Sequence, residues 1–170
     1  MDIRALSSAD AAEFQALRLQ GLRECPTAFA SSFEEECDFA LAVVAERLQH
    51  QHDRAVFGAF QGRELIGLIG IRRERHRKLA HKANIWGMYV ASKVRKQGVG
   101  SQLVASALAY ALSDLRVRQV ILGVNATNEA AIALYQRMGF RAFGREPCFM
   151  LVEGVPQDEI QMVCFLQTAT

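Results

Sequence analysis

The stretch Arg95-Lys96-Gln97-Gly98-Val99-Gly100 decides how this chain is interpreted. An apolar run at 85–90 predicts a strand before it, and a run with helical spacing at 101–115 predicts a helix after it. A strand, a glycine loop and a helix start place backbone N–H groups where they can hold a phosphate. Two glycines also fit a helix start that carries glycine for steric reasons, so the phosphate interpretation needs support from the rest of the chain.

Length and composition describe a globular chain of modest charge. At 170 residues it is most simply one domain, 1–170, and long enough to bury a core. The net charge of +2 is too small to indicate a nucleic-acid partner. Because no apolar run is long enough to span a bilayer and no signal-peptide pattern opens the sequence, we expect a cytoplasmic protein without a membrane partner.

The four cysteines predict free thiols rather than a metal site. None lies in a C-x-x-C pair, and the four histidines show no zinc-type spacing with them. We therefore expect no metal cofactor. Cys164 falls in an apolar run, which indicates a core residue.

The first half of the chain predicts helices followed by a hairpin. The expected elements are a strand at 2–6, a helix at about 9–24, a helix at about 39–50, and strands at 55–60 and 64–71. Ser7 and Asp10 form a capping pair at the first helix, and the last strand is apolar enough to be buried on both faces. The acidic run at 34–36 is most simply a solvated surface.

The segment at 72–82 is the most basic part of the chain. One interpretation is a site for an anion or a nucleic acid. The simpler one is a solvated hairpin tip that keeps a sheet edge soluble, because no aromatic residues alternate with the cations to stack bases. We favour the hairpin tip and do not expect a nucleic-acid partner.

Gly87 gives the second indication of a binding site. A glycine inside a strand often marks a bulge or a close ligand approach, and this one lies just before the glycine loop. The strand at 119–124 follows the helix without a tight turn, which predicts a parallel βαβ unit. A phosphate at the carboxyl end of its first strand would lie where open α/β sheets bind ligands.

The last third of the chain predicts one helix and three strands. Thr127 or Asn128 caps the helix, and Gly139 ends it in a left-handed conformation. The elements that follow are short strands at 140–144 and 149–153, a turn at 154–156 and a strand at 159–166.

Two motifs resemble those of the GNAT superfamily of N-acetyltransferases. Its acyl-CoA loop, [RQ]-x-x-G-x-[GA], is filled here by Arg95, Gly98 and Gly100. Its second signature, N-x-x-A-x-x-L-Y-x-x-x-G-F, is matched by Asn128, Ala131, Leu134, Tyr135, Gly139 and Phe140. The resemblance covers nearly the whole chain. It implies an α/β (α+β) fold with a central mixed, mostly antiparallel sheet, a parallel pair splayed around the pantetheine arm, and helices on both faces.

The resemblance also implies the donor site. Acetyl-CoA would be the co-substrate, with its pyrophosphate held by backbone amides from Lys96 to Ser101 and met by Lys93. A backbone N–H near Met88 or Tyr89 would polarise the thioester carbonyl. The implied cofactor contacts are Met88, Tyr89, Val90, Arg95, Lys96, Gln97, Gly98, Val99, Gly100, Ser101, Asn128, Ala131 and Tyr135.

The implied reaction is direct transfer of the acetyl group to a primary amine. Tyr135 is the candidate general acid for the departing sulfur, since a tyrosine of pKa about 10 holds its proton at neutral pH. No acidic residue occurs at 83–90, so the base is open: a water chain, or one of Glu34, Glu35, His81, Asp158 and Glu159.

The acceptor is equally open. It is expected to be a small-molecule amine or a protein amine, with apolar walls from Phe29, Phe33, Trp86 and Phe149 and an attractive charge from 34–36. A second copy of the chain, forming a homodimer, is a further candidate partner. The alternatives are a catalytically weak CoA-binding or regulatory module and an acyltransferase that uses a longer acyl-CoA.

Overall fold

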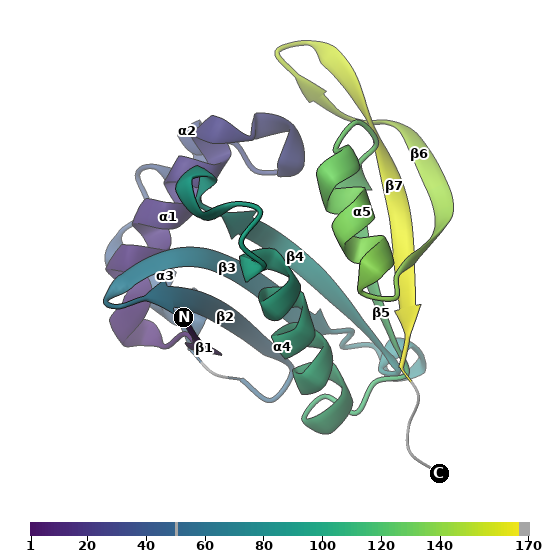
Figure 1. Ribbon diagram of the computed structural model, residues 1–170, viewed down its shortest axis with the longest axis horizontal. Helices are drawn as coiled ribbons and strands as arrows, with labels where there is room; N and C mark the ends of the chain where they lie inside the picture. Colours follow the sequence, from purple (N-terminus) through teal and green to yellow (C-terminus); the bar gives the residue numbers. More distant parts are fainter. Residues whose placement is uncertain (50, 167–170) are drawn as a thin grey trace.

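The strands form one sheet in the residues that the computed structural model describes, 1–49 and 51–166 (Figure 1). In chain order they are β1 (Asp2–Ala5), β2 (Arg54–Gln61), β3 (Glu64–Arg73), β4 (Lys82–Val90), β5 (Gln119–Asn125), β6 (Arg141–Val152) and β7 (Val155–Phe165). The order across the sheet is β1-β2-β3-β4-β5-β7-β6. All neighbours are antiparallel except β4 and β5, so the predicted mixed sheet with one parallel pair is confirmed.

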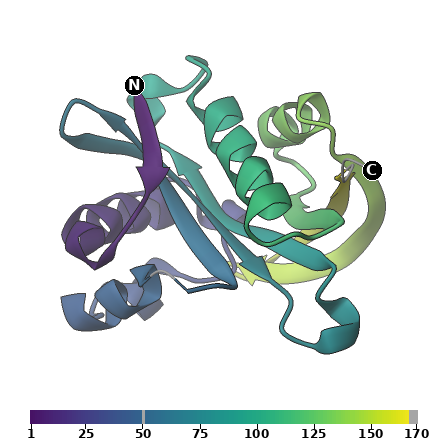
Figure 2. The same cartoon turned by 90° about the horizontal axis from the view of Figure 1, so that it is seen from below.

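Helices cover both faces of this sheet (Figure 2). The α-helices are α1 (Ala11–Glu24), α2 (Phe33–Glu36), α3 (Leu41–Leu48), α4 (Val99–Ser113) and α5 (Glu129–Arg137). Single 3-10 turns are η1 (Ser8–Asp10), η2 (Pro26–Ala28), η3 (Arg77–Leu79) and η4 (Ser92–Val94). The purple and blue helices α1 and α3 lie on one face, and α4 and α5 lie on the other. No helix of residues 1–49 and 51–166 is long and apolar enough to cross a membrane.

The core is centred on β3. Leu68, Ile69 and Ile71 are fully buried, and α1 and α4 pack on this strand from opposite faces. The predicted burial on both faces is therefore confirmed. The Ser7–Asp10 capping pair also forms, and it begins η1 directly before α1.

Strands β4 and β5 pair over only part of their length. Their parallel register joins 82–84 to 119–121 and then ends. On the other side of β4, Trp86 pairs with Gly70 and Tyr89 pairs with Leu68, so the ladder is interrupted between them. Gly87 has φ +64 at this point, which confirms the predicted bulge. The bulge turns β4 away from β5 and opens a gap on the carboxyl side of the pair.

The cap of α5 forms as its sequence predicts. Asn128 Oδ1 accepts a hydrogen bond from Ala131 N at 3.1 Å, which makes Asn128 the cap rather than Thr127. Thr127 instead donates its backbone N–H to Asn125 Oδ1. Gly139 has φ +90, a left-handed conformation that ends the helix.

The predicted pair of short strands at 140–144 and 149–153 is wrong, because one strand, β6, spans Arg141–Val152. Its register shifts between Glu146 and Met150, where Cys148 has φ +50. The sequence suggests a break between two strands here, and the structure has an irregularity within one strand instead. The turn consists of Glu153 and Gly154, both with positive φ, as a two-residue hairpin requires.

The predicted turn at 154–156 and strand at 159–166 are corrected accordingly, since β7 already begins at Val155. Pro156 pairs with Leu151 of β6, and β7 meets β5 only from Glu159 onward. The missing N–H of Pro156 therefore interrupts no hydrogen bond toward β5.

The acidic run at 34–36 is not simply a solvated surface. Glu34 and Glu35 are exposed, but Glu36 is only 4% exposed and pairs with Arg18 of α1. The run forms the short helix α2, in which Glu35 and Ser32 make a capping box. The helix predicted at 39–50 is α3, which ends at Leu48, and residue 50 lies outside the described part of the chain.

Candidate functional site

A cleft of about 760 Å³ opens where β4 and β5 separate. Its volume lies in the range of pockets that hold a ligand the size of a cofactor. Residues 85–90 of β4 and 122–125 of β5 form its sides, and the starts of α4 and α5 close it. Of the predicted cofactor residues, the structure brings together all except Gln97, whose side chain donates to the Lys93 carbonyl instead.

The glycine loop lies at one end of this cleft and prepares the start of α4. Lys96 and Gly98 both have positive φ, and Gly98 is the residue from which the helix begins. Gly100 acts differently, because a Cβ there would lie 3.0 Å from both Leu134 Cδ2 and Met88 Cε. The steric interpretation therefore holds for Gly100, while Gly98 shapes the turn that exposes the first N–H groups of the helix.

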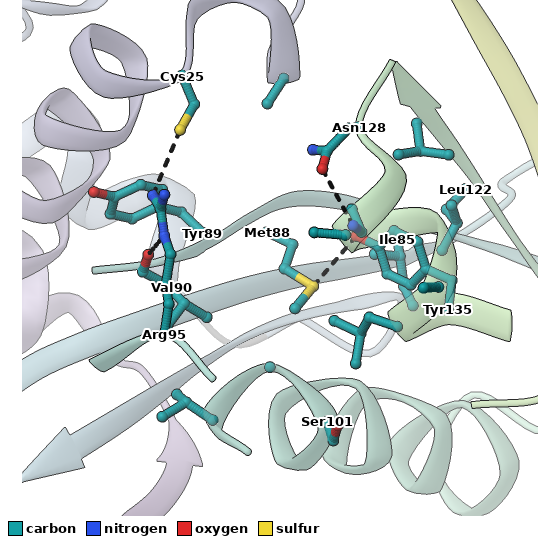
Figure 3. A pocket seen from close by; sticks show the side chains of 18 of the residues that line it. Cys25, Ile85, Met88, Tyr89, Val90, Arg95, Ser101, Leu122, Asn128 and Tyr135 are labelled. Atoms are coloured by element: carbon teal, nitrogen blue, oxygen red, sulfur yellow. Dashed lines mark hydrogen bonds between the residues drawn. The ribbon is translucent and has the colours of Figure 1, made fainter. Parts of the chain in front are cut away.

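Arg95 lines the cleft, and its side chain also supports the glycine loop. Its Nε donates to the Val90 carbonyl at 3.0 Å, and its Nη2 lies 3.5 Å from both Cys25 Sγ and Glu24 Oε2 (Figure 3). The guanidinium also lies over the ring of Tyr89. These contacts tie the loop to the end of β4 and to the end of α1.

Lys93, in contrast, does not line the cleft, and its ammonium pairs with Glu64. Lys96 is exposed and lines the cleft. Among the loop cations that the structure describes, Lys96 is therefore the best placed to meet an anion at the start of α4.

Tyr135 and Met88 face each other inside the cleft (Figure 3). The Tyr135 hydroxyl donates to Met88 Sδ at 3.3 Å, and only 7% of the residue is exposed. Burial raises the pKa of Tyr135 to about 12, so the hydroxyl keeps its proton at neutral pH. A protonated hydroxyl next to a sulfur atom at the bulged strand is a geometry suited to hydrogen-bond donation.

A second cavity of about 270 Å³ adjoins the cleft. The two share lining residues on both sides of the gap, among them Gly87 of β4 and Gly123 of β5. Three of the four predicted aromatic walls line the second cavity: Phe29, Trp86 and Phe149. The fourth, Phe33, instead packs under Arg23 at 3.8 Å.

The five candidate bases separate into two that line a cavity and three that do not. Asp158 and Glu159 line the second cavity. Glu34 and Glu35 are exposed on α2 and line neither cavity. His81 is exposed just before β4, at the end of that strand opposite to the bulge.

The two cavity carboxylates differ in proton affinity. The Cys148 N–H and the Arg145 guanidinium hold the pKa of Asp158 below its usual value. Burial raises the pKa of Glu159, and repulsion from Glu146 adds to this. Glu159 is therefore the stronger proton acceptor of the two.

Two residues of the second cavity region were not expected from the sequence. Arg18 lines the cavity, and its Nη2 lies 2.9 Å from Glu36 Oε1 in a buried ion pair. The sequence carried a signal for Arg18, because this residue follows Phe14 and Leu17 at the spacing of side chains on the core-facing side of a helix. Glu36 carried no such signal within its acidic run.

Comparison with known sequences agrees with the geometry. A profile of the Acetyltransferase (GNAT) family matches residues 19–140. N-alpha-acetyltransferase 30 of Xenopus laevis is 33% identical over 91 residues, which is 54% of this chain and 33% of that protein. This chain thus spans about a third of the length of that curated relative.

Comparison with solved structures supports the same fold. An acetyltransferase of the GNAT family from Streptococcus pneumoniae superposes with a TM-score of 0.86 at 22% identity, covering 97% of this chain and 99% of that one. The yncA protein of Salmonella typhimurium, solved with its cofactor acetyl-CoA, superposes with a TM-score of 0.79 at 17% identity, covering 100% and 96%.

Proposed function

Because the chain belongs to the Acetyltransferase (GNAT) family, we propose that it is an acyl-CoA-dependent N-acyltransferase that moves an acetyl group from acetyl-CoA to a primary amine. The observation that carries the proposal is the cleft between β4 and β5, which has the glycine loop at one end and the Tyr135 hydroxyl within it. A neutral amine attacks the thioester carbon, and CoA leaves as the thiolate.

The donor fits the cleft through backbone groups. The backbone N–H groups from Lys96 to Ser101, in the glycine loop and the first turn of α4, would hold the pyrophosphate, where the helix dipole favours negative charge. The pantetheine arm would lie between the separated strands and bond to their edges, as an added peptide strand does. Met88 lies in the bulge, and its backbone N–H is the proposed donor to the thioester oxygen.

Glu159 is the proposed general base. An amine of pKa about 10 must lose a proton before it attacks, directly or through a water molecule. Glu159 lines the acceptor side of the gap, and its raised pKa makes it a better proton acceptor than an ordinary carboxylate. Asp158 lines the same cavity but is already bound to Arg145 and to the Cys148 N–H.

Tyr135 is the proposed acid for the departing sulfur. A phenol of pKa about 12 is a weaker acid than a thiol of pKa about 8.5, so its hydrogen bond becomes strong only as negative charge develops on sulfur. The hydroxyl thus favours the developing thiolate over the intact thioester, which is the requirement for lowering the barrier.

The curated relative suggests a second acceptor class. Its name, N-alpha-acetyltransferase 30, describes transfer to an α-amine, which in a protein is the N-terminus. A small-molecule amine and a protein N-terminus are therefore the two acceptors that an assay should compare.

Other expectations stay predictions. The continuous sheet supports a single domain, and the exposed Phe143, Leu151 and Val155 on the edge ribbon of β6 and β7 are compatible with a homodimer. The basic segment at 72–82 forms the loop around η3, where Arg75 pairs with Asp53. Cytoplasmic location and the lack of a nucleic-acid partner are expectations from the sequence alone.

The test is thiol release from acetyl-CoA over a panel of amines and peptides, combined with calorimetry of CoA binding. We expect CoA to bind and thiol release to depend on an amine. CoA binding without release for any amine would support the catalytically weak module instead. Faster release from a longer acyl-CoA would support the alternative donor.

A further inference from the structure

The second cavity contains a buried arginine with an unused donor. Arg18 Nε and Nη2 both donate to the Glu36 carboxylate, at 3.2 and 2.9 Å. Its Nη1 is buried and has no hydrogen-bond partner among residues 1–49 and 51–166. Only 8% of the side chain is exposed. A buried N–H group without an acceptor is unfavourable, so this atom has a hydrogen bond left to make with an oxygen.

The unused donor faces the gap between the strands. A Cβ added to Gly87 would lie 3.7 Å from Arg18 Nη1. Gly87 is the bulge residue that lines both cavities. An acceptor that approaches the thioester from the second cavity would therefore pass within reach of this guanidinium.

Charge around Arg18 favours an anion. Glu36 is the carboxylate that pairs with it, and the same carboxylate lies 3.7 Å from Arg47. Two guanidinium groups and one carboxylate leave a net positive charge in this cluster, and Arg18 is its member that lines the cavity. Phe29 packs against the Arg18 guanidinium and shields it from solvent, which strengthens its interaction with a bound anion.

The opposite side of the cavity carries negative charge. Glu159 lies at Gly123 on β5, whereas Arg18 lies at Gly87 on β4, and both glycines line the cleft and the second cavity. A ligand with an amine and a carboxylate close together would match this arrangement. The cavity volume of about 270 Å³ limits the bound part to a small molecule.

We infer that the acceptor is a free amino acid or a similar small zwitterion, with its carboxylate on Arg18 Nη1 and its amine toward Glu159. The inference rests on the proposed acetyl transfer and adds the substrate class. Polyamines lack the carboxylate. A peptide N-terminus presents a neutral carbonyl at that position, which would make a weaker bond to a charged donor.

The test compares matched acceptors on the unmodified protein with acetyl-CoA. Each L-amino acid is paired with its amide, its decarboxylated amine and a dipeptide that begins with the same residue. We expect kcat/KM to be about tenfold to a hundredfold higher for the free amino acid, as for a hydrogen bond to a charged group. Equal or higher values for the amide, amine or dipeptide would overturn the inference while leaving acetyl transfer intact.

A variant identifies the residue responsible. Arg18→Lys keeps a positive charge beside Glu36 but removes the Nη1 group. It should raise KM for the amino acid about tenfold and raise KM for the amide much less, because the neutral carbonyl of the amide makes the weaker bond. Arg23→Lys on the same helix, whose side chain covers Phe33 outside both cavities, is the matched control. An equal loss for amino acid and amide in Arg18→Lys would contradict the assignment.

Two further measurements complete the test. If Arg18→Lys unfolds, the comparison of substrates on the unmodified protein still tests whether the acceptor is a free amino acid. If CoA binds but no acceptor reacts, calorimetry with N-acetyl amino acids and their amides on the CoA-bound protein replaces kinetics. Tighter binding of the carboxylates supports the inference, and no binding or equal binding overturns it. Failure of CoA itself to bind would instead overturn the proposed function.

Discussion

The carboxylate of Glu159 lies against the backbone of Gly123, in the space that a Cβ atom on that residue would occupy. Gly123 lines both the cleft and the second cavity, so the glycine lets a carboxylate from β7 reach the point where the two meet. The register between β5 and β7 fixes this relationship, because Glu159 pairs with Asn125, two residues after Gly123 on β5. The first two predictions depend on this contact.

Replacing Glu159 with glutamine should reduce kcat about a hundredfold at neutral pH, because the amide cannot accept the proton of the amine. CoA affinity should not change, since Glu159 does not line the donor cleft. Thiol-release kinetics and calorimetry measure the two effects. Glu153→Gln in the exposed β6–β7 turn is the control. An unchanged kcat would exclude Glu159 as the base.

The pH dependence should follow from the raised pKa of Glu159. The active form is unprotonated, so kcat/KM falls as the pH falls through this pKa, above the range of an ordinary glutamate. Glu146→Gln removes a repulsive charge and should move the acidic limb to lower pH. A profile that stays in place would show that another group titrates. The same shift affects stability in the opposite sense, because a raised carboxyl pKa stabilises the fold at low pH and this contribution is lost as the pH rises.

Replacing Tyr135 with phenylalanine should lower kcat by about tenfold to a hundredfold and leave CoA binding nearly intact, because only the hydroxyl is lost. The comparison is Tyr110→Phe on α4, whose ring packs against Phe57 away from both cavities. Single-turnover kinetics isolates the chemical step. Equal rates for Tyr135→Phe and the unmodified protein would remove Tyr135 from the mechanism.

Gly98→Ala should weaken CoA binding about tenfold, since φ +82 is strained for alanine and relaxation would misalign the first turn of α4. Gly62→Ala is a matched control, because Gly62 has φ +61 in the β2–β3 turn and likewise has open space around an added Cβ. Both variants should lose similar stability in thermal unfolding. A comparable loss of CoA affinity in Gly62→Ala would show that the effect is general strain.

Glu36→Gln should destabilise the fold by about 3–5 kcal/mol, because it leaves Arg18 buried without its counter-charge. Chemical denaturation measures this, with the exposed Glu34→Gln as control. Burial opposes ionisation of Glu36, but Arg18, helped by Ser31 and Arg47, outweighs it, and together they hold the pKa below its usual value. The pair therefore stabilises the protein at neutral pH, and this contribution is lost as the pH falls through the lowered pKa. A variant as stable as the control would contradict the pair's structural role.

The donor side of the site was predictable because a local backbone requirement calls for a particular residue type, and that residue type can be recognised in the sequence. Gly87 marks a bulge, Gly98 marks a left-handed helix start and Asn128 marks a side-chain cap. Each of these residues affects only the backbone a few positions away in the sequence. The order of motifs then predicts the parallel pair, and the apolar run at 64–71 predicts the central strand.

The acceptor side was less predictable because it depends on contacts between distant segments. Arg18 and Glu36 come together only when α1 and α2 pack, and an acidic run by itself is typical of a solvated surface. Glu159 is one of five candidate bases in the sequence, and only the β5–β7 register brings it to Gly123. The continuity of β6 was hidden because a positive φ at Cys148 is unusual for that residue type.

The short parallel register between β4 and β5 also has a mechanical consequence. Residues 82–84 and 119–121 carry the whole ladder between the two parts of the sheet, whereas β2, β3, β5 and β7 pair over most of their lengths. Bending at this narrow joint would change the width of the cleft without breaking the ladders on either side. The same three residue pairs that leave room for a ligand would therefore be the hinge for any change in the width of the cleft.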